Sequence, residues 1–456
     1  MVVTWRAAAL MAVGMVPVVV VPSLGTVLLW FLVVLAACGA DVALAASPRR
    51  VAVQRRVPAS VRLRSPARSE LVVTNVSGRR LRAVVRDAWP PSAGAQPAPA
   101  GAGRGATGPA PGGVGRYRVD LPDGESARLT TTLVPTRRGD RVAGGVTIRT
   151  SGPLGLAGRQ VTLPVPGRLR VLPEFASRKH LPSRLARLRE MDGRAAVQIR
   201  GEGTEFDSLR EYVVGDDVRS IDWRATARRR DVVVRTWRPE RDRRVLIVLD
   251  TGRTSAARVG GTGEGAGGIG APRLDASIEA ALLLSALAGR AGDRVELLAF
   301  DRAVRSRVAG AAGPRLMPAM AEALATVDPV LLETDWPGIV GQVRARMSQR
   351  ALVVLLTALD PAVVEAGLLP VVDQLARDHQ VVVASVADEE VAALRVGRDT
   401  VAEVYDAAAA ARGDLERTAV TTMLRRYGAE VVEALPDDLA PRLADTYLAL
   451  KAAGRL

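Results

Sequence analysis

The sequence predicts three regions: an N-terminal transmembrane helical hairpin, an antiparallel β-sandwich-like domain, and a C-terminal α/β domain with a doubly wound, mostly parallel sheet. Three observations lead to this fold class. Residues 1–48 hold two long apolar runs, residues 49–175 alternate as strands do, and residues 243–456 alternate continuous apolar strands with helical segments. The 456 residues suffice for two or three domains of ~100–200 residues each.

The first region begins with the apolar run Ala7–Val21 and continues with Leu24–Ala46, which contains Asp41 near its end. The second run is long enough to cross ~30 Å of hydrocarbon as a helix. Residues 22–25, which include Pro22 and Gly25, predict the turn of the hairpin. A cleaved signal peptide and a lipoprotein signal around Cys38 are the alternatives, but the apolar region is long and interrupted.

Positive charges flank the hairpin on both sides. Arg6 precedes it, and four arginines follow it: Arg49, Arg50, Arg55 and Arg56. By the positive-inside rule, both ends lie in the cytoplasm and the bulk of the chain is cytoplasmic. The predicted location is the cell (inner or plasma) membrane.

Composition narrows the classes of partner and site. The formal net charge is +15 and lysine occurs only at Lys179 and Lys451. A chain so rich in Ala, Val, Gly and Arg suggests a GC-rich coding sequence, so the charge favours an anionic membrane surface over nucleic acid. The single cysteine excludes a disulfide within the chain, and two histidines, His180 and His379, argue against a His-rich metal site.

The second region, residues 49–175, is predicted as a small β domain that acts as a spacer or, alternatively, binds a partner. Short strands separated by Gly and Pro turns are typical of an antiparallel sandwich. Residues 90–115 are rich in Pro, Gly and Ala and are predicted as a disordered insert. The expected strands are Ser69–Asn75, Leu81–Arg86, Arg128–Leu133, Val142–Arg149 and Gln160–Val165.

Residues 176–242 connect this domain to the α/β domain of residues 243–456. Continuous apolar strands alternating with helices predict a parallel sheet covered on both faces. Asp250 and Asp360 each follow such a strand, and ligands of these sheets bind at the carboxyl ends of the strands. The expected strands are Val245–Leu249, Val295–Phe300, Ala351–Leu356, Val381–Val386 and Ala429–Val432; the expected helices are Leu274–Ala291, Leu316–Ala325, Ile339–Met347, Pro361–Asp378, Ala402–Tyr427 and Asp438–Lys451.

The stretch from Gly201 to Asp250 packs Gly, Asp, Arg and Trp at short spacings that a core does not need. It resembles the signature of the domain of unknown function 58 family. The residues that carry the resemblance are Gly201, Gly203, Phe206, Leu209, Arg210, Glu211, Tyr212, Gly215, Asp216, Asp217, Arg219, Ile221, Asp222, Trp223, Ala225, Ala227 and Glu240. The resemblance implies a bacterial, membrane-anchored protein with a von Willebrand factor type A-like domain, which here is the α/β domain.

Such a domain typically holds a divalent ion with an Asp-x-Ser-x-Ser loop, a distant Thr and a distant Asp. Here Asp250 and Thr254 occupy the first and last loop positions, whereas Gly252 supplies no oxygen. The expected Thr region, residues 308–317, has no Ser or Thr, and either Thr357 or Asp360 could replace the distant Asp. The candidate metal ligands are therefore Asp250, Thr254 and Asp360, with Mg²⁺ as candidate cofactor; alternatively, Asp250 and Thr254 only cap the loop.

No nucleotide is expected to bind directly, because the glycine-rich loop of residues 259–271 lacks the Gly-Lys-Ser/Thr ending of a phosphate loop. No catalytic residue is assigned. The charged signature is interpreted as a salt-bridged joint between domains or as a partner-recognition surface, since Arg and Trp are frequent at interface hot spots. Its site residues are Arg210, Glu211, Tyr212, Gly215, Asp216, Asp217, Arg219, Asp222 and Trp223.

The resemblance also implies a partner, because proteins of this family are thought to work beside MoxR-type AAA+ ATPases. The leading hypothesis is a non-enzymatic, membrane-anchored adaptor that presents its α/β domain to such an ATPase. The alternatives are a cell-envelope scaffold that binds through its β domain and a metal-dependent hydrolase.

Overall fold

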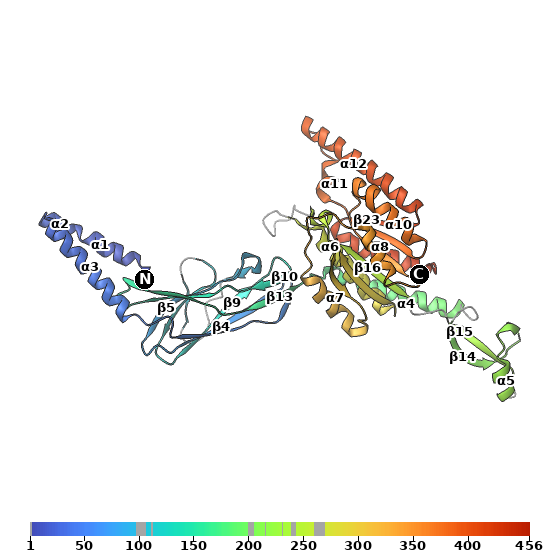
Figure 1. The fold of residues 1–456 in the computed structure, drawn as a ribbon, viewed down its shortest axis with the longest axis horizontal. Helices are drawn as coiled ribbons and strands as arrows, with labels where there is room; N and C mark the ends of the chain where they lie inside the picture. The colour runs from blue at the N-terminus through green and yellow to red at the C-terminus, as the bar shows by residue number, and fades with distance from the viewer. Residues whose placement is uncertain are drawn as a thin grey trace. The chain divides into compact units, whose positions relative to one another are not determined.

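The computed structural model describes residues 2–96, 106–110, 113–198, 205–214, 216–229, 231–238, 243–259 and 270–456. The chain divides into two compact units, Met1–Leu172 and Pro173–Leu456. Figure 1 shows the helices and sheets of both units.

The first unit begins with apolar helices. After the short strand β1 (Val2–Val3) come α1 (Trp5–Val13), α2 (Met15–Val20) and α3 (Leu24–Leu44). Within the described residues, α3 is the one helix long and apolar enough to cross a membrane, and Trp5–Val20 is a shorter apolar segment. The indole of Trp30 donates to the carbonyl of Leu10 at 3.2 Å, and a Cβ at Gly14 would lie 2.1 Å from Cδ1 of Trp30. Glycine at position 14 therefore lets the two apolar runs pack together.

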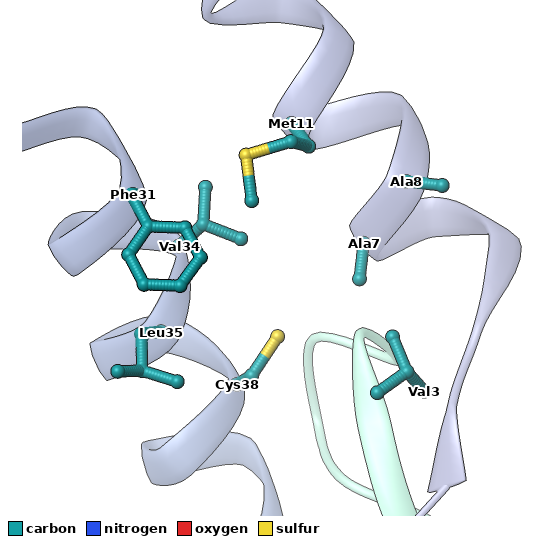
Figure 2. Close-up of a pocket in the computed structure, with 8 residues that line it drawn as sticks. All are labelled: Val3, Ala7, Ala8, Met11, Phe31, Val34, Leu35 and Cys38. Atoms are coloured by element: carbon teal, nitrogen blue, oxygen red, sulfur yellow. The ribbon is translucent and has the colours of Figure 1, made fainter. Parts of the chain in front are cut away.

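An apolar pocket of about 320 Å³ lies between α1 and α3. Figure 2 shows side chains from both helices and from β1 around it, with the Cys38 sulfur pointing into the space. Its lining consists of apolar side chains: Val3, Ala7, Ala8, Met11, Phe31, Val34, Leu35 and Cys38.

Asp41, in the last turn of α3, joins this helix to the β fold of the same unit. Its buried carboxylate accepts backbone hydrogen bonds from Leu154 (2.8 Å), Leu156 (2.7 Å) and Ala157 (2.9 Å). A Cβ at Gly152 would lie 2.1 Å from Oδ1 of Asp41. Arg79 and Arg159 are also held here, since they donate to the carbonyls of residues 43 and 42 at the end of α3. The charge of Asp41 thus fixes a loop against the end of the helix.

The rest of the first unit is a β fold in which a six-stranded sheet (order β1-β12-β11-β5-β8-β7) packs against a four-stranded sheet (β2-β4-β9-β6). Both sheets are antiparallel throughout, which confirms the predicted antiparallel sandwich-like sheets; a third sheet (β10-β13-β3) contains one parallel pair. The core includes Leu71, Leu129 and Ile148. The bounds are β2 Val51–Arg56, β3 Ser60–Arg62, β4 Ala67–Asn75, β5 Leu81–Asp87, η1 Pro91–Ala93, β6 Ala95–Gln96, β7 Ala106–Pro109, β8 Arg116–Leu121, β9 Ser126–Leu133, β10 Gly139–Val142, β11 Val146–Ser151, β12 Ala157–Leu163 and β13 Arg168–Leu172.

Two predictions differ from this arrangement. The expected single strand Val142–Arg149 is two strands in different sheets, β10 and β11. Gly144 and Gly145 lie between them, and a Cβ at Gly145 would lie 2.6 Å from Cγ2 of Thr162, so the chain crosses between sheets where only glycine fits. Inside the expected disordered insert, residues 91–96 and 106–109 form η1, β6 and β7, while residues 97–105 and 111–112 lie outside the described part.

The second unit is built around a six-stranded sheet of order β20-β19-β16-β21-β22-β23. All neighbours are parallel except β19 and β20. Successive residues of β16 face opposite sides: Ile247 packs with α6 and α13, whereas Leu246 packs with α8 and α10. The sheet is therefore mixed, mostly parallel and covered on both faces, consistent with the predicted α/β class.

The bounds in this unit are η2 Ala176–His180, α4 Leu181–Gln198, β14 Glu205–Glu211, η3 Val218–Ser220, α5 Trp223–Arg229, β15 Val233–Arg238, β16 Arg244–Asp250, η4 Arg253–Ala256, β17 Arg258–Val259, β18 Ala271–Pro272, α6 Arg273–Arg290, β19 Arg294–Phe300, β20 Val304–Val308, η5 Gly313–Arg315, α7 Leu316–Ala325, α8 Trp336–Arg344, β21 Leu352–Leu356, α9 Pro361–Val363, the π-helical turn η6 Val364–Leu368, α10 Leu369–Ala376, β22 Gln380–Val386, α11 Glu389–Leu394, α12 Val401–Arg426, β23 Ala429–Ala434 and α13 Pro436–Ala452. The sequence did not predict β20 or α11. β20 has Arg at every second position and lies at the sheet edge, where charged side chains are common.

Candidate functional site

The candidate site lies at the carboxyl edge of this sheet, where the strand order reverses. The chain passes from β16 to β19 on one side, and β21 pairs with β16 on the other. Asp250 is the last residue of β16, and Thr357 directly follows β21. In open α/β sheets this reversal is where ligands bind.

Asp250 is 2% exposed, and both of its carboxylate oxygens accept hydrogen bonds. Oδ1 accepts from the backbone of Gly252 at 2.8 Å and from the hydroxyl of Thr334 at 2.6 Å. Oδ2 accepts from the hydroxyls of Thr254 at 3.2 Å and Thr357 at 2.7 Å. One carboxylate is thus surrounded by three threonine hydroxyls from three different loops.

Gly252 explains why Thr334 can reach the carboxylate. A Cβ at position 252 would lie 2.1 Å from Oγ1 of Thr334 and 3.0 Å from the carbonyl oxygen of Leu332. The hydroxyl of Thr334 therefore occupies the space that a larger residue in the middle loop position would need. Residues 308–317 hold no Ser or Thr, and the distant threonine comes instead from residue 334, which the sequence did not predict.

Backbone hydrogen bonds hold the segment that carries Thr334. Val330 donates to the carbonyl of Thr251 at 2.8 Å, and Arg253 donates to that of Leu332 at 2.8 Å. The side chain of Arg253 forms an exposed ion pair with Glu333 at 2.9 Å. Backbone hydrogen bonds thus join the loop after β16 to the segment before α8, and the guanidinium of Arg253 pairs with Glu333.

A second buried carboxylate lies next to the first. Asp301 follows β19; its Oδ2 accepts from the Thr251 hydroxyl at 2.9 Å and from Nε of Arg305 at 2.6 Å. Burial acts to raise the pKa of Asp301, but the hydrogen bonds from Arg305, the Arg302 and Ala303 amides and Thr251 outweigh it and hold the pKa below its ordinary value. Asp301 therefore stays ionised and is neutralised by Arg305.

The predicted metal ligands are only partly brought together. Asp250 and Thr254 are in contact, but the hydrogen bond from the β21 end comes from Thr357 rather than Asp360. Asp360 is exposed and caps α9, its Oδ1 accepting from the amide of Ala362 at 3.1 Å. The oxygen donors at Asp250 are of the type that Mg²⁺ prefers, but they include a single carboxylate. No group of three or more His, Cys, Asp or Glu suited to a metal ion occurs in the described residues.

The signature segment forms a separate hairpin of β14 and β15, with η3 and α5 between the strands. Its aspartates stabilise turns. Asp216 pairs with Arg210 and accepts from the amide of Val213 at 2.9 Å. Asp217 caps η3 through the amide of Arg219 at 2.9 Å.

Asp222 has the same kind of role at the start of α5. Its Oδ1 accepts from the amides of Arg224 and Ala225, both at 3.0 Å, and its Oδ2 pairs with Arg235 at 2.8 Å. The Ala225 amide and the Arg235 guanidinium lower the pKa of Asp222. The dense spacing of Asp and Arg in the signature is thus explained by local turns.

The described part of the hairpin exposes apolar side chains among charged ones. Val214 is 95% exposed and Trp223 is 68% exposed. Val213 and Val218 are exposed nearby in sequence, as are the predicted site residues Glu211 and Arg219, while Tyr212 is half-buried. Gly215 lies outside the described residues, as do Gly201, Gly203 and Glu240.

Comparison with known proteins supports the family resemblance. Residues 208–431 match the family model described as "Protein of unknown function DUF58". This match includes the signature hairpin from residue 208 onward and the Asp250 site. No curated protein matches the chain.

Solved structures resemble a smaller part of the chain. A CARDB domain of a Pyrococcus furiosus protein, in complex with di-metal ions, is 17% identical, covers 27% of this chain and 87% of its own, and has a TM-score of 0.17. A cohesin module of a Clostridium perfringens family 33 glycoside hydrolase is 10% identical, with coverages of 26% and 96% and a TM-score of 0.20. A non-cellulosomal cohesin from Archaeoglobus fulgidus is 11% identical, with coverages of 28% and 96% and a TM-score of 0.18. These likenesses carry no argument about function.

Proposed function

We propose that the protein is a non-enzymatic, membrane-anchored adaptor that presents a von Willebrand A-like domain to a cytoplasmic partner, a MoxR-type AAA+ ATPase. One observation carries the proposal. The signature hairpin uses its aspartates to hold its own turns and leaves Val214 and Trp223 exposed. Exposed Trp beside Arg is the composition of an interface hot spot.

The anchor of the proposal is α3, whose 21 residues span about 30 Å of hydrocarbon as a helix. The apolar pocket between α1 and α3 fits the same environment, because its lining carries no charged side chain. Arg6, Arg49, Arg50 and Arg56 supply the positive charge that favours a cytoplasmic location for the bulk of the chain. Arg55 is not counted with them, since its side chain is buried against Asp87 at 2.6 Å.

At the strand edge we propose that Mg²⁺, if bound, is held by Asp250 with the hydroxyls of Thr254, Thr334 and Thr357. The ion would supply a positive charge to which a carboxylate of the partner could bind. The three threonine side chains are held in place by their hydrogen bonds to the carboxylate of Asp250. Saturable Mg²⁺ binding in calorimetry, lost in Asp250→Ala, is the expected result; no heat of binding in the unmodified chain contradicts this part.

The test of the adaptor function is capture of a purified MoxR-type ATPase by the full chain in detergent micelles. Trp223→Ala and Val214→Asp are expected to abolish capture, because both side chains lie on the exposed surface. Val304→Asp is the matched control, since Val304 is also exposed but belongs to the edge strand β20. Capture that survives both hairpin substitutions contradicts the proposal.

A cell-envelope scaffold is the second candidate. The observation that favours it is the Asp41 joint, which fixes the β fold directly to the end of α3. In that case, deletion of the β fold is expected to abolish the function of the protein in the cell, whereas Trp223→Ala is expected to leave that function unchanged. A metal-dependent hydrolase is the weaker alternative, and turnover lost on chelation would be its evidence.

A further inference from the structure

Helices α11 and α12 follow one another in the second unit (Figure 1). Both helices and the turn between them expose apolar side chains. Within 22 residues of sequence the exposed large hydrophobic residues are Leu394, Val396, Val401, Val404, Tyr405 and Leu415, of which Val396 is 80% exposed. Exposed apolar patches of this kind mark interaction sites.

The residues on α12 follow a regular spacing. Val401, Val404, Ala408, Ala411 and Leu415 are all exposed and are separated by three, four, three and four positions. At 3.6 residues per turn these five positions lie within an arc of about 80°. Alternating steps of three and four are the a and d positions of a heptad, the spacing at which helices pack side by side. We call these five residues the α12 seam.

The α12 seam is distinct from the face by which the helix packs on its own domain. The buried residues of α12 are Ala407, Ala410, Val420 and Leu424, with Val420 and Leu424 in the core beneath the sheet. The centre of this buried face lies about 155° around the helix from the centre of the seam. The helix thus has one apolar face inside its domain and a second one exposed.

We propose that the α12 seam binds the α12 seam of a second copy of this chain, with the two helices antiparallel about a two-fold axis. The axis passes between Ala408 and Ala411. Val404 of one copy then packs against Leu415 of the other, and Ala408 packs against Ala411. The two alanines at the centre allow close approach of the helices, and the larger residues close the ends of the interface.

A second copy fits the seam because four of its five residues face one another across this axis, while Val401 comes opposite Thr418. A two-fold axis requires the same patch on both copies, and the sequence has large residues at both ends and small ones in the middle. Antiparallel helices also oppose their dipoles favourably. Arg412, which flanks the seam, comes to lie beside Tyr405 of the other copy, where a cation–π contact can form.

Disulfide cross-linking of the full chain in lipid vesicles tests the proposal. Cys38 is the single cysteine, so Cys38→Ser gives a clean background. In that background the double variant V404C/L415C is expected to form a covalent dimer on mild oxidation. The two positions are 11 residues apart on one helix, about 16 Å, so they cannot pair within one chain. V404C and L415C alone are expected to stay monomeric, because in the antiparallel pair neither residue meets its own equivalent.

Matched controls separate the seam from the rest of the helix. Ala402 and Ala409 are exposed on the flank of α12, and A402C/A409C is expected to give no covalent dimer. In sedimentation of the detergent-solubilised chain, Ala408→Glu is expected to abolish dimers, whereas the neighbouring Ala409→Glu leaves them and circular dichroism unchanged.

Three outcomes overturn the proposal. A covalent dimer from V404C alone means that the helices are parallel. Absence of dimer from the double variant, with both cysteines open to alkylation, means that the seam is unpaired. Absence of dimer in vesicles, with both cysteines protected from alkylation in native cell membranes, means that a different protein covers the seam.

Discussion

The hydroxyl of Thr334 occupies the space that a side chain at position 252 would need, so a substitution of Gly252 should affect the Asp250 site. Gly252 has a φ of −74°, a value that any residue adopts, so Gly252→Ala introduces no backbone strain. Its cost is steric, because the new Cβ would lie 2.1 Å from Oγ1 of Thr334. Thr334 must move away and lose its hydrogen bond to the charged Asp250, which costs about 1.5–3 kcal/mol.

Part of that cost is offset in the unfolded state, where alanine has less conformational freedom than glycine by about 0.4–1 kcal/mol. We therefore expect Gly252→Ala to lower the free energy of unfolding by about 1–2 kcal/mol. In a Thr334→Ala background the obstructing hydroxyl is gone. The same Gly252→Ala change then meets the Leu332 carbonyl oxygen at 3.0 Å as its closest contact and is expected to cost much less, so the two substitutions couple by about 1 kcal/mol.

The assay is urea unfolding of the purified full chain in micelles, followed by pulse proteolysis and detection of the C-terminal unit. Four proteins complete the cycle: the unmodified chain, both single variants and the double variant. Distant, independent sites add to within about 0.5 kcal/mol. Additive costs at positions 252 and 334 would therefore refute the claim that Thr334 fills the space above Gly252.

Two further predictions concern the first unit. Asp41→Ala leaves three backbone N–H groups without their acceptor, at a cost of about 1–3 kcal/mol each, and is expected to make residues 152–157 accessible to proteolysis. Asp41→Asn keeps one acceptor oxygen and should make them less accessible than Asp41→Ala does. Equal protection of this loop in all three proteins would contradict the role of Asp41. The hydrogen bonds from Arg170 and Arg168 lower the pKa of Asp140 from 3.8 to about 2, so this carboxylate contributes stability above pH 3.8 that is lost as the pH falls through about 2. A carboxyl titration by NMR should show that value and its rise in Arg170→Met, and an unchanged midpoint in that variant would remove Arg170 as the cause.

The sequence predicted the parallel strands well because they are buried on both faces and therefore read as continuous apolar runs. Val245–Leu249 and Val381–Val386 each lie within a strand that the structure forms, β16 and β22. Where a glycine or charged residues determine the course of the chain, the pattern of apolar residues did not predict the strands. Gly144 and Gly145 divide one apparent strand between two sheets, and the Arg-rich β20 has no apolar run to mark it.

The candidate site shows the same limit more sharply. Asp250 and Thr254 could be predicted because they lie four residues apart in one loop. Thr334 is 84 residues from Asp250 and approaches it through a segment whose position depends on backbone hydrogen bonds to residues 251 and 253. The one local signal was the glycine at position 252, interpreted as a missing ligand.

The structure gives that glycine a different meaning. A serine at position 252 could carry its oxygen only from a Cβ 3.1 Å from Oδ1 of Asp250 and 2.1 Å from the hydroxyl of Thr334, so the two side chains exclude one another. A loop that lacks one oxygen can thus retain its set of donors when another segment supplies the missing hydroxyl from the same side. Whether such a site binds an ion then depends on its charge rather than on its count of oxygens. With Asp301 already neutralised by Arg305, the charge available here is that of Asp250 alone, and this predicts a weak affinity for Mg²⁺ that Thr334→Asp should raise.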